Sequence, residues 1–91
     1  RQVVADSDAP LALFLLGVWL EQQGRLQQAQ SRYRQVLSQH PAHAGAQLLL
    51  ADQLLRQHAW ADAASHYQQA WQLDPENYRA RLRQIIALAA L

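Results

Sequence analysis

Residues 29–41 read AQSRYRQVLSQHP, and residues 63–75 read AASHYQQAWQLDP. The second stretch lies 34 residues after the first, and at this offset Tyr33 aligns with Tyr67 and Pro41 with Pro75. Ten identities fall within one 34-residue window, the other eight being Ala12/Ala46, Leu15/Leu49, Leu16/Leu50, Leu20/Leu54, Gln23/Gln57, Ala29/Ala63, Ser31/Ser65 and Gln35/Gln69. Self-similarity at a fixed period of this size is typical of a repeat protein.

Each period predicts two helices. In residues 26–37 the apolar side chains recur at the spacing of one helix face, and residues 60–71 show the same pattern. The segments that precede them, 11–20 and 46–55, are apolar nearly throughout. We therefore expect these two segments to form helices that are buried on several sides.

Turn residues mark where the helices end. Gly24 suits the left-handed residue that follows a helix, and His58 takes the same place in the second period, where a positive φ costs more. Pro41 and Pro75 close each period, because the residue before a proline disfavours the α conformation.

The composition indicates one packed helical domain. The chain has 91 residues, of which 51% are hydrophobic and 16% charged, and this excludes intrinsic disorder. A formal net charge of +1 argues against a dedicated nucleic-acid-binding protein. With no cysteine there is neither a disulfide framework nor a thiolate zinc site.

The basic residues and the first residue of the chain bear on its origin. All eight basic residues are arginine, which favours a GC-rich, bacterial genome. The first residue is Arg1 rather than methionine, so we expect a piece of a longer protein. The localisation stays open between the bacterial cytoplasm and the periplasm.

The repeat resembles the tetratricopeptide repeat (TPR) family, whose unit is a helix-turn-helix of 34 residues. The matching positions are the small residues Gly17 and Ala51 of the first helices, the alanines Ala29 and Ala63 and the tyrosines Tyr33 and Tyr67 of the second helices, and the closing prolines Pro41 and Pro75. The resemblance implies an all-α fold, a right-handed superhelix of antiparallel helix pairs. We expect Gly17 to nest against Ala29, and Ala51 against Ala63, because small residues let helices approach closely.

The resemblance also divides the chain. We expect residues 1–9 to be an N-terminal flank, 10–43 the first repeat, 44–77 the second, and 78–91 either the first helix of a third repeat or a capping helix. Two departures from the family pattern stand out. Val36 replaces the usual alanine late in the first repeat, which predicts slightly wider spacing to the second, and the bulky Ile85 occupies a position that is normally Gly or Ala.

In TPR proteins the first helix of each unit lines a concave groove. The resemblance places eleven residues of this chain there: Leu11, Phe14, Val18, Glu21, Gln22, Leu48, Asp52, Leu55, Arg56, Leu82 and Ile86. Phe14, Val18 and Leu48 stand where the family's carboxylate clamp has Lys and Asn, so we do not expect binding of a chaperone tail. The predicted groove is largely apolar, with a few charges.

These features predict a protein-interaction module that binds a partner peptide or helix in the groove. We expect no catalysis by this segment, no cofactor, no metal, no nucleic-acid partner and no insertion into a membrane. Neighbouring repeats or a second copy could fill the groove instead. Two alternatives for the parent protein remain: an enzyme similar to TPR-linked glycosyltransferases or sulfotransferases, and a periplasmic scaffold of a polysaccharide or cellulose secretion system.

Three other clusters of polar residues are not expected to form functional sites. His40 and His43 flank a proline turn, which does not aim two imidazoles at one metal ion. Asp62 and His66 stand one helical turn apart, and we expect a surface contact between them. Arg79, Arg81 and Arg83 form a small basic cluster that we expect to be an ordinary solvated face.

Overall fold

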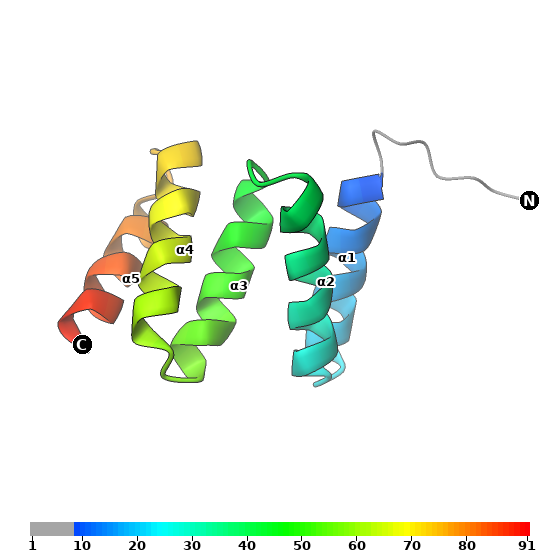
Figure 1. Ribbon diagram of the computed structural model, residues 1–91, viewed down its shortest axis with the longest axis horizontal. Coiled ribbons are helices and arrows are strands. Elements are labelled where there is room, and N and C mark those ends of the chain that lie inside the picture. The colour runs from blue at the N-terminus through cyan, green and yellow to red at the C-terminus, as the bar shows by residue number, and fades with distance from the viewer. Residues whose placement is uncertain (1–8) are drawn as a thin grey trace, which may run out of the picture.

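The computed structural model describes residues 9–91, which form a stack of helices in chain order (Figure 1). The described residues contain no strand, so the all-α prediction is confirmed. Successive helices run antiparallel, and their bounds are α1 Ala9–Gln22, α2 Leu26–Gln39, α3 Ala44–Arg56, α4 Trp60–Leu73 and α5 Tyr78–Ala89. Across residues 9–91, no helix combines the length and the apolarity needed to cross a membrane.

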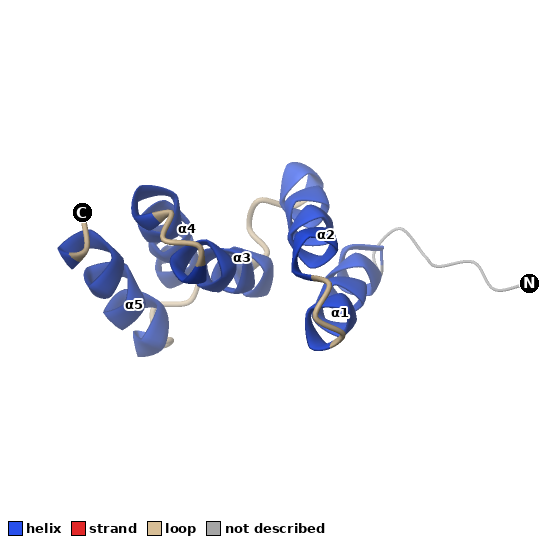
Figure 2. Ribbon diagram, turned by 90° about the horizontal axis from the view of Figure 1, so that it is seen from below, coloured by secondary structure: helices blue, strands red, loops and turns tan. Residues whose placement is uncertain are grey.

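The helices pack most extensively in two pairs, α1 with α2 and α3 with α4, and α5 packs on α4 (Figure 2). The contact between α2 and α3 is clearly smaller than the equivalent contact between α4 and α5. Val36 is buried at the first of these junctions, where the second has the smaller Ala70. The wider spacing that Val36 predicts is consistent with this difference.

The turns have the conformations that the sequence indicates. Gly24 and His58 both adopt positive φ, +80° and +64°, two residues after the last residues of α1 and α3. Pro41 lies beyond the end of α2. His43 then caps α3, because its Nδ1 accepts a hydrogen bond of 3.0 Å from the backbone N–H of Ala46. This leaves His43 with a structural role at a helix N-terminus.

Two tyrosines are the largest fully buried side chains of the stack. Tyr33 and Tyr67 both have no exposed surface, and both belong to one core cluster with Ala29, Ala51, Leu50 and Leu54. A Cβ added at Gly17 would lie only 2.6 Å from Cε1 of Tyr33. The small residue of α1 therefore makes room for the tyrosine ring, a closer contact than the nesting against Ala29 that we expected.

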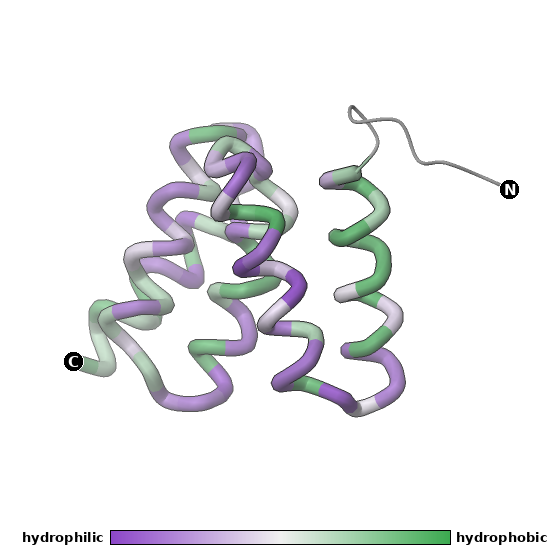
Figure 3. Tube along the Cα trace, turned by 45° about the vertical axis from the view of Figure 1, so that its right-hand side comes forward, coloured by the Kyte–Doolittle hydropathy of each residue, from purple (hydrophilic) through white to green (hydrophobic). Residues whose placement is uncertain are grey.

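The prediction that segment 11–20 is buried on several sides is wrong. In α1 only Gly17 and Leu20 are buried, whereas the side chains of Leu11, Leu15 and Trp19 are about half exposed (51%, 53% and 50%). The hydropathy colouring shows α1 as apolar along nearly its whole length although one side is open (Figure 3). The reason is its place as the first helix of the described stack.

The equivalent segment of the second repeat, 46–55, shows the expected burial. Leu50 and Ala46 are completely buried because α2 and α4 cover α3 from two sides. Leu16 and Ala12 occupy the same repeat positions in α1 and are exposed. Burial in this fold is therefore set by neighbours in the stack as well as by local hydrophobicity.

The hydrogen bond of His66 differs from the expected contact with Asp62. His66 Nδ1 lies 2.6 Å from Oε1 of Gln47, a buried side chain of α3. The Nε2 of Gln47 donates to the carbonyl of Pro41 over 3.1 Å. Burial, followed by the nearby Arg34 guanidinium, lowers the pKa of His66. The ring therefore joins α4 to α3 and to the loop between the repeats.

Replacing Gly17 by alanine tests the close contact between α1 and Tyr33. Gly→Ala in a helix interior normally stabilises by about 0.5–1 kcal/mol. Here the added methyl would meet a ring that is itself fully buried, so we expect Gly17→Ala to lower the free energy of unfolding by about 1–3 kcal/mol. Urea denaturation followed by circular dichroism measures this. Ser31→Ala, at an exposed site on α2, is the control, and a gain in stability for Gly17→Ala would contradict the packing.

Candidate partner-binding groove

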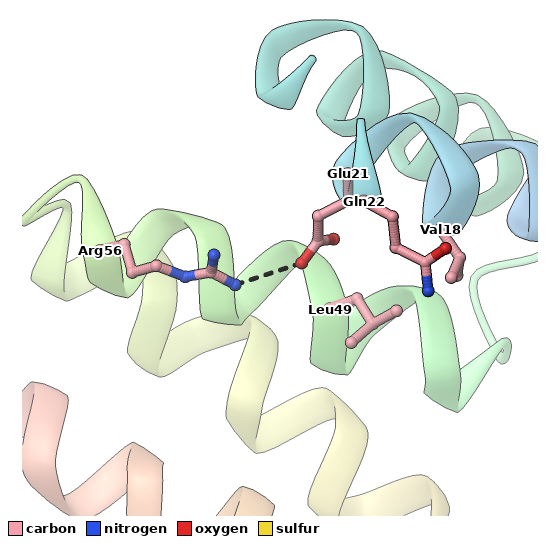
Figure 4. A pocket seen from close by; sticks show the side chains of 5 residues that line it. All are labelled: Val18, Glu21, Gln22, Leu49 and Arg56. Carbon is pink, nitrogen blue, oxygen red and sulfur yellow. Dashed lines mark hydrogen bonds and ion pairs between the residues drawn. The ribbon is translucent and has the colours of Figure 1, made fainter. Parts of the chain in front are cut away.

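A pocket of about 350 Å³ opens between α1 and α3 (Figure 4). Its lining residues are Val18, Glu21, Gln22, Leu49 and Arg56. Four of these five belong to the predicted groove. Leu49 was missed, although it precedes Asp52 by three residues and Arg56 by seven, a spacing that places all three on one helix face.

Glu21 stands at the edge of this pocket and binds three side chains. Its Oε1 accepts a hydrogen bond of 2.7 Å from the hydroxyl of Tyr33 and a longer one of 3.4 Å from Nε2 of Gln53. Its Oε2 lies 3.2 Å from Nη2 of Arg56 (Figure 4). The carboxylate therefore links α1 to α2 through Tyr33 and to α3 through Arg56.

Asp52 repeats this arrangement one unit further along the stack. It accepts a hydrogen bond from the hydroxyl of Tyr67, and both its oxygens lie 3.0 Å from Nη1 of Arg83. We refer to Tyr33–Glu21–Arg56 and Tyr67–Asp52–Arg83 as the Tyr–carboxylate–Arg triads. In each triad the carboxylate comes from the first helix of a pair, the tyrosine from the second helix, and the arginine from the first helix of the next unit.

The triads neutralise the acidic charges of the groove. Burial raises the pKa of both tyrosine hydroxyls, and their hydrogen bonds to the carboxylates raise it further, so the hydroxyls stay protonated donors. Each carboxylate also has an arginine partner. Glu21 and Asp52 are therefore engaged within the stack, and the groove offers an apolar surface beside compensated ion pairs.

The structure does not gather all the predicted groove residues into the pocket. Phe14 is partly buried, with its ring centroid 5.9 Å from that of Tyr33 and 4.7 Å from that of His43, so it packs between the repeats. Leu48 and Leu55 are partly buried against the core cluster. Outside the pocket lining, the exposed predicted residues are Leu11 on α1 and Leu82 and Ile86 on α5.

The basic cluster of α5 is divided among separate partners. The guanidinium of Arg81 lies 5.1 Å from the ring centroid of Trp71, and Arg83 pairs with Asp52. Arg79 and Arg81 are nevertheless exposed, as a solvated face predicts, whereas Arg83 is partly buried by its contact with Asp52. Within residues 9–91, no group of three or more His, Cys, Asp or Glu side chains is placed to hold a metal ion.

The Tyr–carboxylate–Arg triads predict that each tyrosine hydroxyl stabilises the stack. Tyr33→Phe and Tyr67→Phe keep the ring but remove the donor to a carboxylate, and such hydrogen bonds contribute about 1.5–3 kcal/mol. We expect each variant to lose stability by about this amount in urea denaturation. Tyr78→Phe serves as the matched control, since Tyr78 is 68% exposed and its loss of a hydroxyl should change stability by less than about 0.5 kcal/mol.

The raised pKa of these tyrosines predicts a loss of stability at high pH. In the unfolded chain a tyrosine deprotonates near its ordinary pKa of about 10, whereas in the folded chain Tyr33 and Tyr67 resist deprotonation. Their contribution is therefore fully present below pH 10 and is lost as the pH rises above it. Melting temperatures from pH 8 to 11.5 should fall less steeply for the Tyr33→Phe/Tyr67→Phe double variant than for the unaltered chain, and parallel curves would contradict this assignment.

Comparison with known proteins agrees with the geometry of the stack. A family model described as tetratricopeptide repeat matches residues 20–78, which is more than half of the chain. The match spans the second helix of the first pair, the whole second pair and the loop before α5. No curated protein matches the chain significantly. The chain belongs to the tetratricopeptide repeat family, a family of helical repeats that generally mediate protein–protein interactions.

Proposed function

We propose that this chain binds a partner peptide or helix in the pocket between α1 and α3. The observation that supports this proposal is the pocket itself, where the apolar Val18 and Leu49 lie beside the Glu21–Arg56 ion pair. Concave, mostly apolar sites with a few polar groups are the usual form of a binding site. The pocket also lies on first helices of the repeats, the elements that line the groove in this family.

The separation of α1 and α3 creates this space. The two helices are joined by side chains, the Glu21–Arg56 pair and Phe14 beside Gly45, because α2 and not α3 packs directly against α1. Val18 and Leu49 thus remain only partly buried. An apolar side chain inserted between them would complete the contact that the helices do not make with each other.

The chemistry of the pocket favours an apolar anchor on the partner. Glu21 is already hydrogen-bonded to Tyr33 and paired with Arg56, so a basic partner residue would have to compete with these contacts. Gln22 is exposed at the rim and offers an amide donor and acceptor. Each Å² of apolar surface buried in the pocket contributes roughly 25 cal/mol, before the costs of ordering.

A peptide library displayed on phage tests the proposal. Peptides selected on the unaltered chain are measured by fluorescence anisotropy against Gln22→Trp, in which an indole occupies the pocket. We expect at least tenfold weaker binding of the selected peptides and an enrichment of Leu, Ile or Phe in their sequences. Gln22 is exposed, so this substitution leaves the core intact, and circular dichroism verifies that the helices persist.

The adjacent glutamine provides a matched control. Gln23 is also exposed, but it follows the end of α1 and does not line the pocket. We therefore expect Gln23→Trp to bind the peptides as tightly as the unaltered chain does. Peptides that bind Gln22→Trp normally, or that lose affinity equally for both variants, would show that binding takes place elsewhere.

A further inference from the structure

The last helix, α5, has an apolar face on each of two opposite sides. Its inner face holds Ala80, Gln84 and Ala87, which are buried against α4. Its outer side and the flanks of that side carry five large hydrophobic residues with exposed fractions between 48% and 68%: Tyr78, Leu82, Ile85, Ile86 and Leu88. A helix that is apolar on opposite sides is normally covered on both.

The centre of the outer face is a regular seam. Tyr78, Leu82, Ile85 and Ala89 are separated by four, three and four residues, the spacing of the core positions of a two-stranded coiled coil. We refer to these four residues as the α5 seam. On a helix of 3.6 residues per turn they fall in one narrow stripe, opposite to Ala80, Gln84 and Ala87.

The α5 seam is complementary to itself when two copies run antiparallel. Pairing around its midpoint places Leu82 against Ile85 of the other copy, and Tyr78 against Ala89. The two medium-sized side chains thus meet at the centre, and the large tyrosine meets the small alanine at each end. A two-fold interface requires such reciprocal pairs, in which one residue contacts a second residue that contacts the first in return.

Ile85 makes this face unsuitable for the packing seen inside the repeats. It aligns with Gly17 and Ala51, the small residues that lie against the second helix of each pair. At Gly17, even a Cβ would be 2.6 Å from the ring of Tyr33. A helix that packed on α5 as α2 packs on α1 would therefore collide with the isoleucine, whereas a coiled-coil seam accommodates a β-branched side chain.

We propose that a second copy of this chain covers the α5 seam, with the two α5 helices antiparallel in a symmetric dimer. A stable interface buries about 800 Å² on each partner, and single apolar patches on monomers rarely exceed about 600 Å². The large side chains on the outer side of α5 and its flanks, each at least 48% exposed, contribute apolar surface to this area. A polar rim surrounds the apolar centre in such interfaces.

The charges of α5 are compatible with the antiparallel arrangement. The helix contains no acidic residue, and two of its arginines are engaged in their own chain, Arg81 over Trp71 and Arg83 with Asp52. Arg79 is exposed in the first turn. In the dimer it lies level with the last turn of the other α5, where a helix dipole favours a positive charge. A parallel pair would instead bring the two Arg79 side chains together.

The oligomeric state in solution tests the proposal. Sedimentation equilibrium of the unaltered chain should give twice the mass of one chain, and Ile85→Glu should give the mass of one chain with unchanged helicity, because the side chain is half exposed. The control is Leu15→Glu, at a leucine that is 53% exposed on α1, and it should remain a dimer. A monomeric unaltered chain, or a dimer that is broken by Leu15→Glu and not by Ile85→Glu, would overturn the proposal.

Cysteine cross-linking tests the direction of the helices independently. The chain has no cysteine, so Leu82→Cys and Ile85→Cys introduce single thiols. Under mild oxidation an equimolar mixture should form the mixed 82–85 disulfide at least fivefold faster than either variant cross-links to itself. Faster 82–82 and 85–85 cross-linking would indicate parallel helices and would overturn the antiparallel arrangement. The absence of any cross-link would show that the α5 seams do not meet.

Discussion

The burial of one tyrosine per repeat is the constraint on which the rest of this structure depends. The ring of Tyr33 takes the space that Gly17 leaves on α1, and Tyr67 occupies the same repeat position beside the small Ala51. A ring in this place has its hydroxyl directed at the first helix of its own pair, because the apolar part is enclosed and the polar tip needs a partner. Glu21 and Asp52 supply that partner.

The position of these carboxylates has consequences for the groove. Each one is reached by an arginine from the next unit, so the same interaction that satisfies a buried hydroxyl also joins successive repeats. Contacts that hold the stack together therefore reach the edge of the pocket. What remains free for a partner is the apolar space beside the first ion pair, between Val18 and Leu49. Recognition by this surface is accordingly expected to depend on shape and apolar contact more than on charge.

The first and last helices of the described stack, α1 and α5, each have an exposed apolar face. The face of α1 that is equivalent to the buried face of α3 carries Leu16 and Trp19 in the open, and α5 carries its seam in the same state. The two ends differ in one physical respect. The position that aligns with Gly17 is occupied by the bulky Ile85 in α5. The symmetric contact that we propose between two α5 helices rests on this difference.

The sequence by itself determined the period, the approximate bounds of the helices, and the turns at Gly24 and His58. These features depend on residues that are near in the chain, through helical periodicity, backbone stereochemistry and a repeated pattern. The resemblance to the repeat family placed four of the five pocket residues in the groove, because the family's groove positions lie on the first helix of each unit.

Only the tertiary structure decided which apolar faces are covered and which partners the charged side chains take. Segment 11–20 is more apolar than 46–55, yet it is more exposed because no helix lies on its outer side within the described stack. Arg56 and Arg83 reach carboxylates 35 and 31 residues away in the chain. Such contacts depend on the angle between stacked pairs and on side-chain rotamers. No local pattern sets either, because both result from packing between repeats.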